Sequence, residues 1–192
     1  MIEYLEQLRR FCPCCEQEKS DQRVILACCE ADPQRVLTRA SEAAHLTSSG
    51  LVLNPALDRV LMVYHNIYQS WSWTGGHCDG DPDLLGVALR EVGEETGLRE
   101  MRPLTPELMS LDILPVPAHI KRGSYVSVHL HLSAAFVLVA PEQLPLRAKP
   151  DENSGVRWFD ADRLAEVCSE PEMVVVYDKM IRRARAFAAG QQ

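Results

Sequence analysis

Long apolar stretches are missing from this sequence, which excludes a helix that spans a membrane. The longest apolar runs, such as Ala134–Ala140, have only the length of a strand. The first residues, Met1–Leu8, contain acids and no apolar core before a cleavage site of small residues, so they do not resemble a signal peptide. These absences predict a cytoplasmic protein that has no membrane partner.

An excess of positive charge is also missing. The formal net charge is −7, from 27 acidic and 20 basic residues, whereas proteins that bind nucleic-acid backbones need a basic face. We therefore expect no nucleic-acid partner. A bound cation and a few local Lys or Arg residues can still attract phosphate to an acidic protein, so a small phosphorylated substrate is compatible with this charge.

Repeats and low-complexity stretches are missing as well. The seven cysteines include the adjacent pairs Cys14-Cys15 and Cys28-Cys29. Their odd number, in a chain with no leader, favours free thiols over a disulfide framework. The spacing from Cys12 to Cys15 is not typical of a structural zinc site, so free thiols are also favoured over zinc ligands.

A length of 192 residues predicts one core domain with additional segments. Residues 1–44 show helical spacing and predict an N-terminal helical extension. Over residues 45–168, β-branched and apolar runs bracket one central helix, which predicts the catalytic or binding domain. Residues 169–192 predict a C-terminal amphipathic helix packed on that domain. Strands around a central helix, with helices after the sheet, predict an α/β sandwich.

Local signals set the expected ends of two helices. Asp81 is expected to cap the central helix, with Pro82 in its first turn and Gly97 ending it. Ser169 and Glu172 have the spacing of a capping box at the start of the last helix.

The central helix carries a group of acids in the run Arg-Glu-Val-Gly-Glu-Glu-Thr-Gly-Leu, residues 90–98. In a helix, Glu91, Glu94 and Glu95 fall within an arc of about 100°. Like-charged neighbours of this kind repel by about 0.2–0.5 kcal/mol per pair, and the C-terminal half of a helix disfavours anions. Helix stability does not explain the arrangement, whereas a bound divalent cation does. Mg²⁺ suits carboxylate oxygens and substrate phosphates, and a solvated acidic face is the alternative.

The acids belong to a longer pattern that resembles the Nudix box. That box is a glycine, five residues, a glutamate, seven residues, and then Arg-Glu-apolar-X-Glu-Glu-X-Gly-apolar. Here Gly76-His77-Cys78-Asp79-Gly80-Asp81-Pro82 is followed by seven residues and by Arg90–Leu98, so nearly every fixed position matches over 23 residues. The resemblance implies a Nudix-type α/β/α sandwich with a mixed sheet. It also implies an Mg²⁺-dependent hydrolase of a nucleoside diphosphate linked to another moiety.

The same resemblance implies roles for individual residues. Glu91, Glu94 and Glu95 would hold Mg²⁺ or Mn²⁺, with the carbonyl of Gly76 or that of Gly75 as a further ligand. Glu91 is a frequent candidate for the general base, and Glu95 would act beside it. Arg90 would orient these carboxylates by charge-assisted hydrogen bonds. Water would attack a phosphorus of the substrate diphosphate.

Two positions outside these roles bear on activity. Pro82 stands where the box has a glutamate, and Asp81 or Asp83 is expected to compensate for the lost carboxylate. This departure leaves a non-catalytic Nudix-like ligand-binding or regulatory module as the alternative function. Many Nudix enzymes also place a catalytic glutamate in the loop before the last strand, where this chain has Glu152. A polar turn is an equally good interpretation of that loop.

Six side chains are candidates for substrate binding, namely Trp73, His77, Lys121, Arg122, His129 and His131. The ring of Trp73 would stack on a nucleobase, although closure of the core is an alternative. Lys121 and Arg122, in a loop before a strand, would supply charge for phosphate.

The histidines have alternatives of their own. His129 and His131 share one face of a long, half-buried strand and lie about 7 Å apart. They would line the substrate cleft, and a merely polar strand face is slightly favoured over that interpretation. His77 follows the glycine pair, where an exposed loop histidine is as good an interpretation as a ligand contact.

A third alternative is isopentenyl diphosphate isomerase, which shares the fold but moves a proton instead of adding water. That enzyme relies on a catalytic cysteine and a histidine-rich metal site, and the order of His77 and Cys78 does not match it. Among hydrolase substrates, nucleotide sugars, ADP-ribose-like molecules, (d)NTPs and dinucleoside polyphosphates all stay open. A homodimer is also left open.

Overall fold

The computed structural model describes residues 2–121 and 123–190. Its helices are α1 (Glu3–Arg10), α2 (Glu16–Ala31), α3 (Leu84–Thr96) and α4 (Pro171–Gly190), with the short 3₁₀ helices η1 (Arg35–Leu37) and η2 (Leu164–Glu166). Its strands are β1 (Ala44–Leu53), β2 (Arg59–His65), β3 (Ser70–Ser72), β4 (Thr74–His77), β5 (Arg102–Pro103), β6 (Ser110–Val116), β7 (His119–Lys121), β8 (Ser124–Val126), β9 (His129–Val139) and β10 (Asn153–Asp160).

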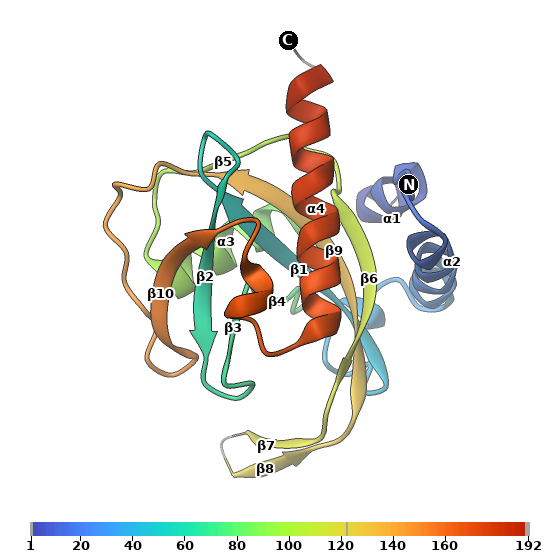
Figure 1. Cartoon of the computed structure of the whole chain (residues 1–192). Helices are drawn as coiled ribbons and strands as arrows, with labels where there is room; N and C mark the ends of the chain where they lie inside the picture. The colour runs from blue at the N-terminus through green and yellow to red at the C-terminus, as the bar shows by residue number, and fades with distance from the viewer. Residues whose placement is uncertain (1, 122, 191–192) are drawn as a thin grey trace.

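Eight strands of the described residues form one mixed sheet. Its main path is β10-β2-β1-β9-β5, and β3, β4 and β6 pair with β2, β1 and β9 respectively. β1 and β9 run parallel, whereas β1 is antiparallel to both β2 and β4. Strands β7 and β8 form a separate hairpin that projects beyond the main sheet (Figure 1). The predicted mixed sheet is confirmed.

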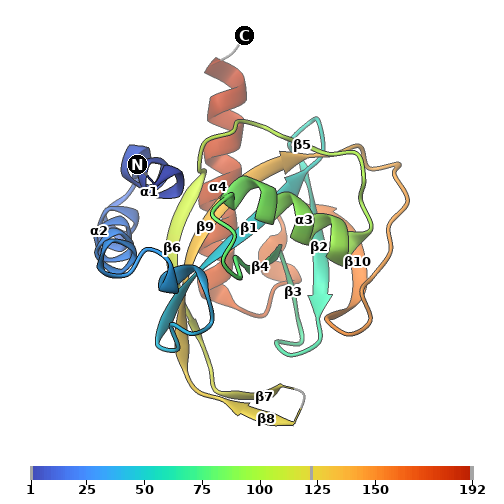
Figure 2. The ribbon, with the colours of Figure 1, turned by 180° about the vertical axis from the view of Figure 1, so that it is seen from behind.

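Helices cover both faces of this sheet, as Figures 1 and 2 show from opposite sides. Alternate residues of β1 point to opposite faces. Leu46 and Val52 join the buried cluster that contains residues of α1, α2 and α3. Leu51 and Leu53 join the cluster that contains the buried face of α4. The predicted α/β/α sandwich is therefore confirmed, and each cluster fixes a helix layer by burying apolar surface.

The start of α3 differs from the expectation. Asp83, not Asp81, is the N-cap, and its carboxylate accepts a hydrogen bond from the Gly86 N–H at 2.9 Å. Asp81 instead accepts from the Asp83 N–H and from Arg90, so the chain makes one more turn before the helix begins. The predicted end is confirmed, because Gly97 adopts a left-handed conformation with φ 77°.

Two further local expectations were wrong. Helix α4 begins at Pro171, and the Ser169 N–H donates to the Ser70 hydroxyl, so Ser169 does not open a capping box. The long strand expected across residues 126–132 is interrupted, because β8 ends at Val126 and β9 begins at His129.

A buried ion network links the N-terminal helices to the rest of the fold; it consists of Glu18, Asp112, Lys179 and Arg183. Lys179 Nζ lies 3.1 Å from Glu18 and 2.6 Å from Asp112. Arg183 pairs with Glu18 at 3.1 Å. Burial raises the pKa of Glu18, but the Cys14 N–H and the two cations outweigh it and hold that pKa below its ordinary value. The network therefore joins α2, β6 and α4 through compensated charges.

The cysteines are free thiols, as predicted. All seven lie within the described residues and none forms a disulfide. No helix in residues 2–121 and 123–190 combines the length and apolarity that a membrane crossing needs.

Candidate active site

Helix α3 lies close to the sheet because glycines face it. A Cβ at Gly50 of β1 would lie 2.7 Å from the Val92 side chain. A Cβ at Gly76 of β4 would overlap the Glu91 carboxylate. The glycines therefore let the acidic side of α3 approach the edge strand β4.

Glu95 is the buried member of the acidic group, and Glu91 is half-buried. Glu95 is 5% exposed, and its carboxylate accepts a hydrogen bond from the Gly75 N–H at 3.0 Å. Burial, followed by the charges of Glu152 and Glu91, raises the pKa of Glu95 to about 8. Burial and the charge of Glu94 also raise the pKa of Glu91. One buried and one half-buried carboxylate thus lie one helical turn apart, and cations of the chain do not fully compensate their charges.

Glu94 is more exposed and has a cationic partner. Lys149 Nζ lies 3.0 Å from Glu94 and 3.2 Å from Glu152, so one ammonium group joins the helix to the loop before β10. Asn153, the first residue of β10, is fully buried and donates to the Glu95 carbonyl at 3.0 Å. Glu152 therefore lies beside the acidic helix, and its catalytic role stays a prediction.

The three glutamates do not converge on one point. Among the described residues, the acid, histidine and cysteine groups whose ligand atoms all lie within 4.8 Å of one another are His45, His77 and His131, and Cys14, Cys15 and Glu18. Glu94 is turned toward Lys149 instead of toward Glu91 and Glu95. Glu91, Glu95 and the Gly75–Gly76 backbone form the compact part of the site.

Arg90 has two acidic neighbours. Its guanidinium lies 3.2 Å from Asp81 Oδ2 and 3.6 Å from Glu91 Oε1. Of the two aspartates that flank Pro82, Asp81 therefore contacts Arg90, whereas Asp83 caps the helix.

With this geometry described, comparison with known proteins decides the family. The NUDIX domain family model matches residues 44–184, which is most of the chain. The chain belongs to the Nudix family. The matched range contains the sheet, the acidic helix and most of α4.

Solved Nudix structures share the fold at low sequence identity. An Ap4A hydrolase from C. elegans matches with a TM-score of 0.51 and 14% identity, over 76% of this chain and 98% of that one. The dihydroneopterin triphosphate pyrophosphohydrolase of E. coli matches with a TM-score of 0.54 and 15% identity, over 71% of this chain and 94% of that one. At these identities, the likeness shows a shared fold.

A cleft of about 520 Å³ lies beside helix α3. Four cations line it, namely Arg90, Arg99, Arg147 and Lys149, together with Glu94 and apolar residues. Sequence reasoning missed Arg99, Arg147 and Lys149 as candidates, because Arg147 and Lys149 come from a loop about 50 residues downstream of the helix. The cleft gives the otherwise acidic protein a local surface suited to phosphate.

The expected substrate-binding residues of this Nudix protein separate into three places. Trp73 packs its ring on Tyr177 with centroids 5.6 Å apart and is half-buried against the α4 cluster, which favours closure of the core. His77, His129 and His131 gather around His45, and His77 lies in β4 instead of a loop. Lys121 ends β7, while its side chain and Arg122 lie outside the described residues.

Proposed function

We propose that this Nudix protein is a divalent-metal-dependent pyrophosphohydrolase that cleaves a nucleoside diphosphate linked to another moiety. The observation that carries this proposal is the position of the half-buried Glu91 and the buried Glu95 against the Gly75–Gly76 backbone. Burial raises the pKa of both groups. A nearby cation would favour their charged forms, so the site is suited to receive one.

The residues at this site fit Mg²⁺ or Mn²⁺. Carboxylate oxygens are the hard ligands that both ions prefer, and Gly76 leaves room for close approach because a Cβ there would overlap Glu91. Glu91 and Glu95 would hold the ion with Glu94, which pairs with Lys149 in this structure, and the Gly76 carbonyl would be a further ligand. When bound, the ion supplies polarisation of the phosphoryl oxygens and neutralises charge in the transition state.

The other groups would bind substrate and move a proton. Arg99 and Arg147 would hold substrate phosphates in the basic cleft. Water attacks one phosphorus and forms a new P–O bond, and the bond from that phosphorus to the bridging oxygen breaks, so the other phosphate group departs with the bridging oxygen. Glu152, whose side chain is 41% exposed beside Lys149, would accept the proton from that water, and Glu91 is the alternative base. Arg90 would hold Glu91 in position.

Two structural observations oppose the alternative functions. A non-catalytic module was suggested by Pro82, but Asp81 still gives Arg90 a carboxylate partner. An isomerase needs an accessible cysteine, whereas Cys78 is 1% exposed and burial raises its pKa to about 12. Hydrolysis is therefore the better supported reaction.

A substrate screen tests the proposal. The full-length protein with Mg²⁺ is incubated with nucleotide sugars, ADP-ribose-like molecules, (d)NTPs and dinucleoside polyphosphates in heavy-oxygen water. We expect hydrolysis of at least one class, with the label in a single phosphate product that identifies the attacked phosphorus.

The matched variants are Glu91→Gln, in the site, and Glu100→Gln, an exposed glutamate just beyond the helix. Glu91→Gln should abolish turnover and Glu100→Gln should leave it unchanged. Turnover that is equal in all three proteins, or no turnover of any class by folded protein, would contradict the proposal.

A further inference from the structure

Four histidines from three strands lie on one face of the sheet. In the parallel β1–β9 pair, His45 lies directly opposite His131. In the antiparallel β1–β4 pair, Thr47 lies opposite His77, and Thr47 shares a face with His45 because side chains alternate along a strand. His129 precedes His131 by two residues and joins the same face.

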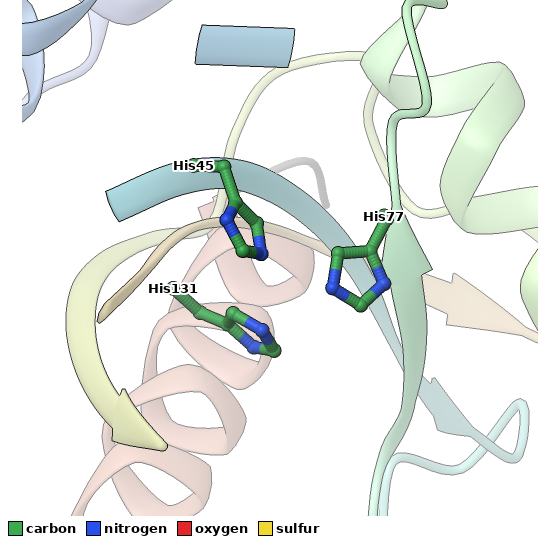
Figure 3. A group of neighbouring side chains, drawn as sticks. All are labelled: His45, His77 and His131. Atoms are coloured by element: carbon green, nitrogen blue, oxygen red, sulfur yellow. The ribbon is translucent and has the colours of Figure 1, made fainter. Parts of the chain in front are cut away.

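The rings are in mutual contact. The centroids of His45 and His77 lie 4.9 Å apart, those of His45 and His131 5.2 Å apart, and those of His77 and His131 5.1 Å apart. Figure 3 shows these three rings directed toward one another from different strands. His129 stacks on His45 with a centroid separation of 5.0 Å. The nearly equal separations place the first three rings around a common point.

This group is separate from the glutamates. Gly76 faces Glu91 on the α3 side of β4, so its neighbour His77 points to the opposite face. The Ser48 hydroxyl, which donates to the Leu84 carbonyl of α3, likewise marks the helix side of β1. Strand β4 therefore has the glutamates on one side and the histidines on the other.

His45 is prepared to accept a ligand. It is 4% exposed, and its Nδ1 lies 3.1 Å from the Ser41 carbonyl. A proton on Nδ1 that is donated to this carbonyl leaves the lone pair on Nε2, the arrangement found for metal-binding histidines. His45 Nε2 and the Ser133 hydroxyl oxygen, both buried, have no hydrogen-bond partner among the described residues. Unpartnered buried polar atoms of this kind are costly unless they bind something.

We propose that His45, His77 and His131 bind one divalent transition-metal ion of the zinc class, in a site distinct from the magnesium site. Imidazole nitrogens suit Zn²⁺ and other first-row transition metals such as copper, iron and nickel, whereas Mg²⁺ prefers oxygen ligands. The ligand nitrogens all lie within 4.8 Å of one another. Nitrogens bound tetrahedrally to zinc lie about 3.3 Å apart, so small rotations of the half-buried His77 and His131 complete the site. Three histidines leave one coordination position for water or a phosphate oxygen.

A histidine metal site alone does not make the protein an isomerase of the type considered above. That reaction also needs an accessible cysteine, which the buried Cys78 does not provide. The site is argued from the three rings and the unpartnered His45 nitrogen, and it holds whether or not the glutamates catalyse hydrolysis.

Metal binding by the full-length protein tests the site directly. Tag-free, chelator-treated protein is titrated with Zn²⁺ in a large excess of Mg²⁺, and Co²⁺ serves as a spectroscopic probe of the ligands. We expect one Zn²⁺ per chain and a tetrahedral Co²⁺ spectrum without the thiolate charge-transfer band. His45→Gln, His77→Gln and His131→Gln should each weaken Zn²⁺ binding by at least about 100-fold.

Matched variants separate this site from the other metal-binding groups. His65→Gln, in β2 and stacked on Tyr68, should bind Zn²⁺ like the wild type, as should Glu95→Gln and the Cys14→Ser/Cys15→Ser double variant. If His45→Gln fails to fold, the less buried His77 and His131 decide the question. The proposal is overturned if the histidine variants bind Zn²⁺ normally, or if the cysteine variant loses it.

Discussion

Two groups of buried carboxylates in this protein have opposite surroundings. Glu18 and Asp112 are fully or almost fully buried but lie within 3.1 Å of Lys179, and Arg183 also pairs with Glu18. Glu95 is also buried, but the charged groups that act on its carboxyl include two further glutamates, Glu152 and Glu91. The pKa of Glu18 is accordingly lowered, whereas the pKa of Glu95 is raised.

The difference indicates different roles. A buried carboxylate that serves the fold is compensated by cations of the chain itself, because an uncompensated buried charge is costly. Glu95 of α3 has no ion pair of this kind and its pKa stays raised, so we infer that the cation of this site comes from outside the chain. The following experiments test this contrast, beginning with the largest expected effect.

Replacement of Glu95 should separate activity from stability. Glu95→Gln should lower kcat/KM with Mg²⁺ by about 10³-fold, because the site loses a charged group that acts on the transition state. The metal-free variant should be at least as stable as the wild type, because the folded protein no longer has to protonate a buried carboxyl or keep its charge buried. Steady-state kinetics and thermal unfolding in chelator measure both effects. A variant that is both active and destabilised would reverse the assignment.

Replacement of Lys179 should have the opposite outcome. Lys179→Met leaves Glu18 and Asp112 without their shared cation and should lower the free energy of unfolding by about 3–5 kcal/mol. Activity per folded molecule should stay unchanged, because the network lies away from α3. Lys19→Met is the control, since its pair with Glu16 is exposed and should contribute less than about 1 kcal/mol. Urea denaturation measures the difference, and equal effects of the two variants would contradict it.

The two groups should also respond to pH with opposite signs. Glu95 has a raised pKa, so its contribution to metal-free stability is full below 4.5 and is lost as pH rises through about 8. Glu18 has a lowered pKa, so its contribution is present above 4.5 and is lost as pH falls through the folded-state pKa. In chelator, unfolding free energies between pH 5 and 8 should fall in the wild type by a few kcal/mol, since one pKa unit corresponds to about 1.4 kcal/mol. Glu95→Gln should make this decrease with pH smaller. If the free energy of unfolding falls with pH as steeply in Glu95→Gln as in the wild type, Glu95 is not its cause.

The smallest expected effect concerns the support of Arg90. Asp81→Asn should lower kcat/KM by about 10-fold, equivalent to about 1.4 kcal/mol, because Arg90 loses the carboxylate that compensates for Pro82. Stability should change by less than about 1 kcal/mol, since the pair is exposed. The control is Asp79→Asn. Asp79 lies in the same loop as Asp81 and forms an exposed ion pair with Arg39, which this substitution breaks. Equal kinetics for both variants would show that Asp81 does not support the site.

The features that could be predicted from the sequence are those that depend on residues close together in the chain. The box at residues 76–98 gave the family and the fold, and Gly97 gave the end of α3. The helix start was misplaced because two aspartates were equally good caps, and only the contact between Asp81 and Arg90 distinguishes them. The proposed cytoplasmic location, the domain limits and a homodimer stay predictions.

Features that depend on distant pairing could not be predicted. The histidine group requires the parallel register that places His45 beside His131, two residues separated by more than 80 positions. The pair between Arg183 of α4 and Glu18 of α2 likewise joins residues that are 165 positions apart. No local pattern links these positions, because their contacts arise only when the sheet and the terminal helices assemble.

Mn²⁺ binding tests the central claim that the α3 glutamates receive an external cation. Electron paramagnetic resonance can count bound Mn²⁺ in the wild type, in Lys179→Met and in the Glu91→Gln/Glu95→Gln double variant. We predict that the wild type binds one Mn²⁺ ion and that Mg²⁺ displaces this ion. Lys179→Met should keep the same affinity for Mn²⁺. In the double variant the affinity should fall by at least about 10-fold, because the loss of a metal ligand weakens binding more than the loss of a residue that only supports a ligand. Equal Mn²⁺ binding by all three proteins would contradict the account.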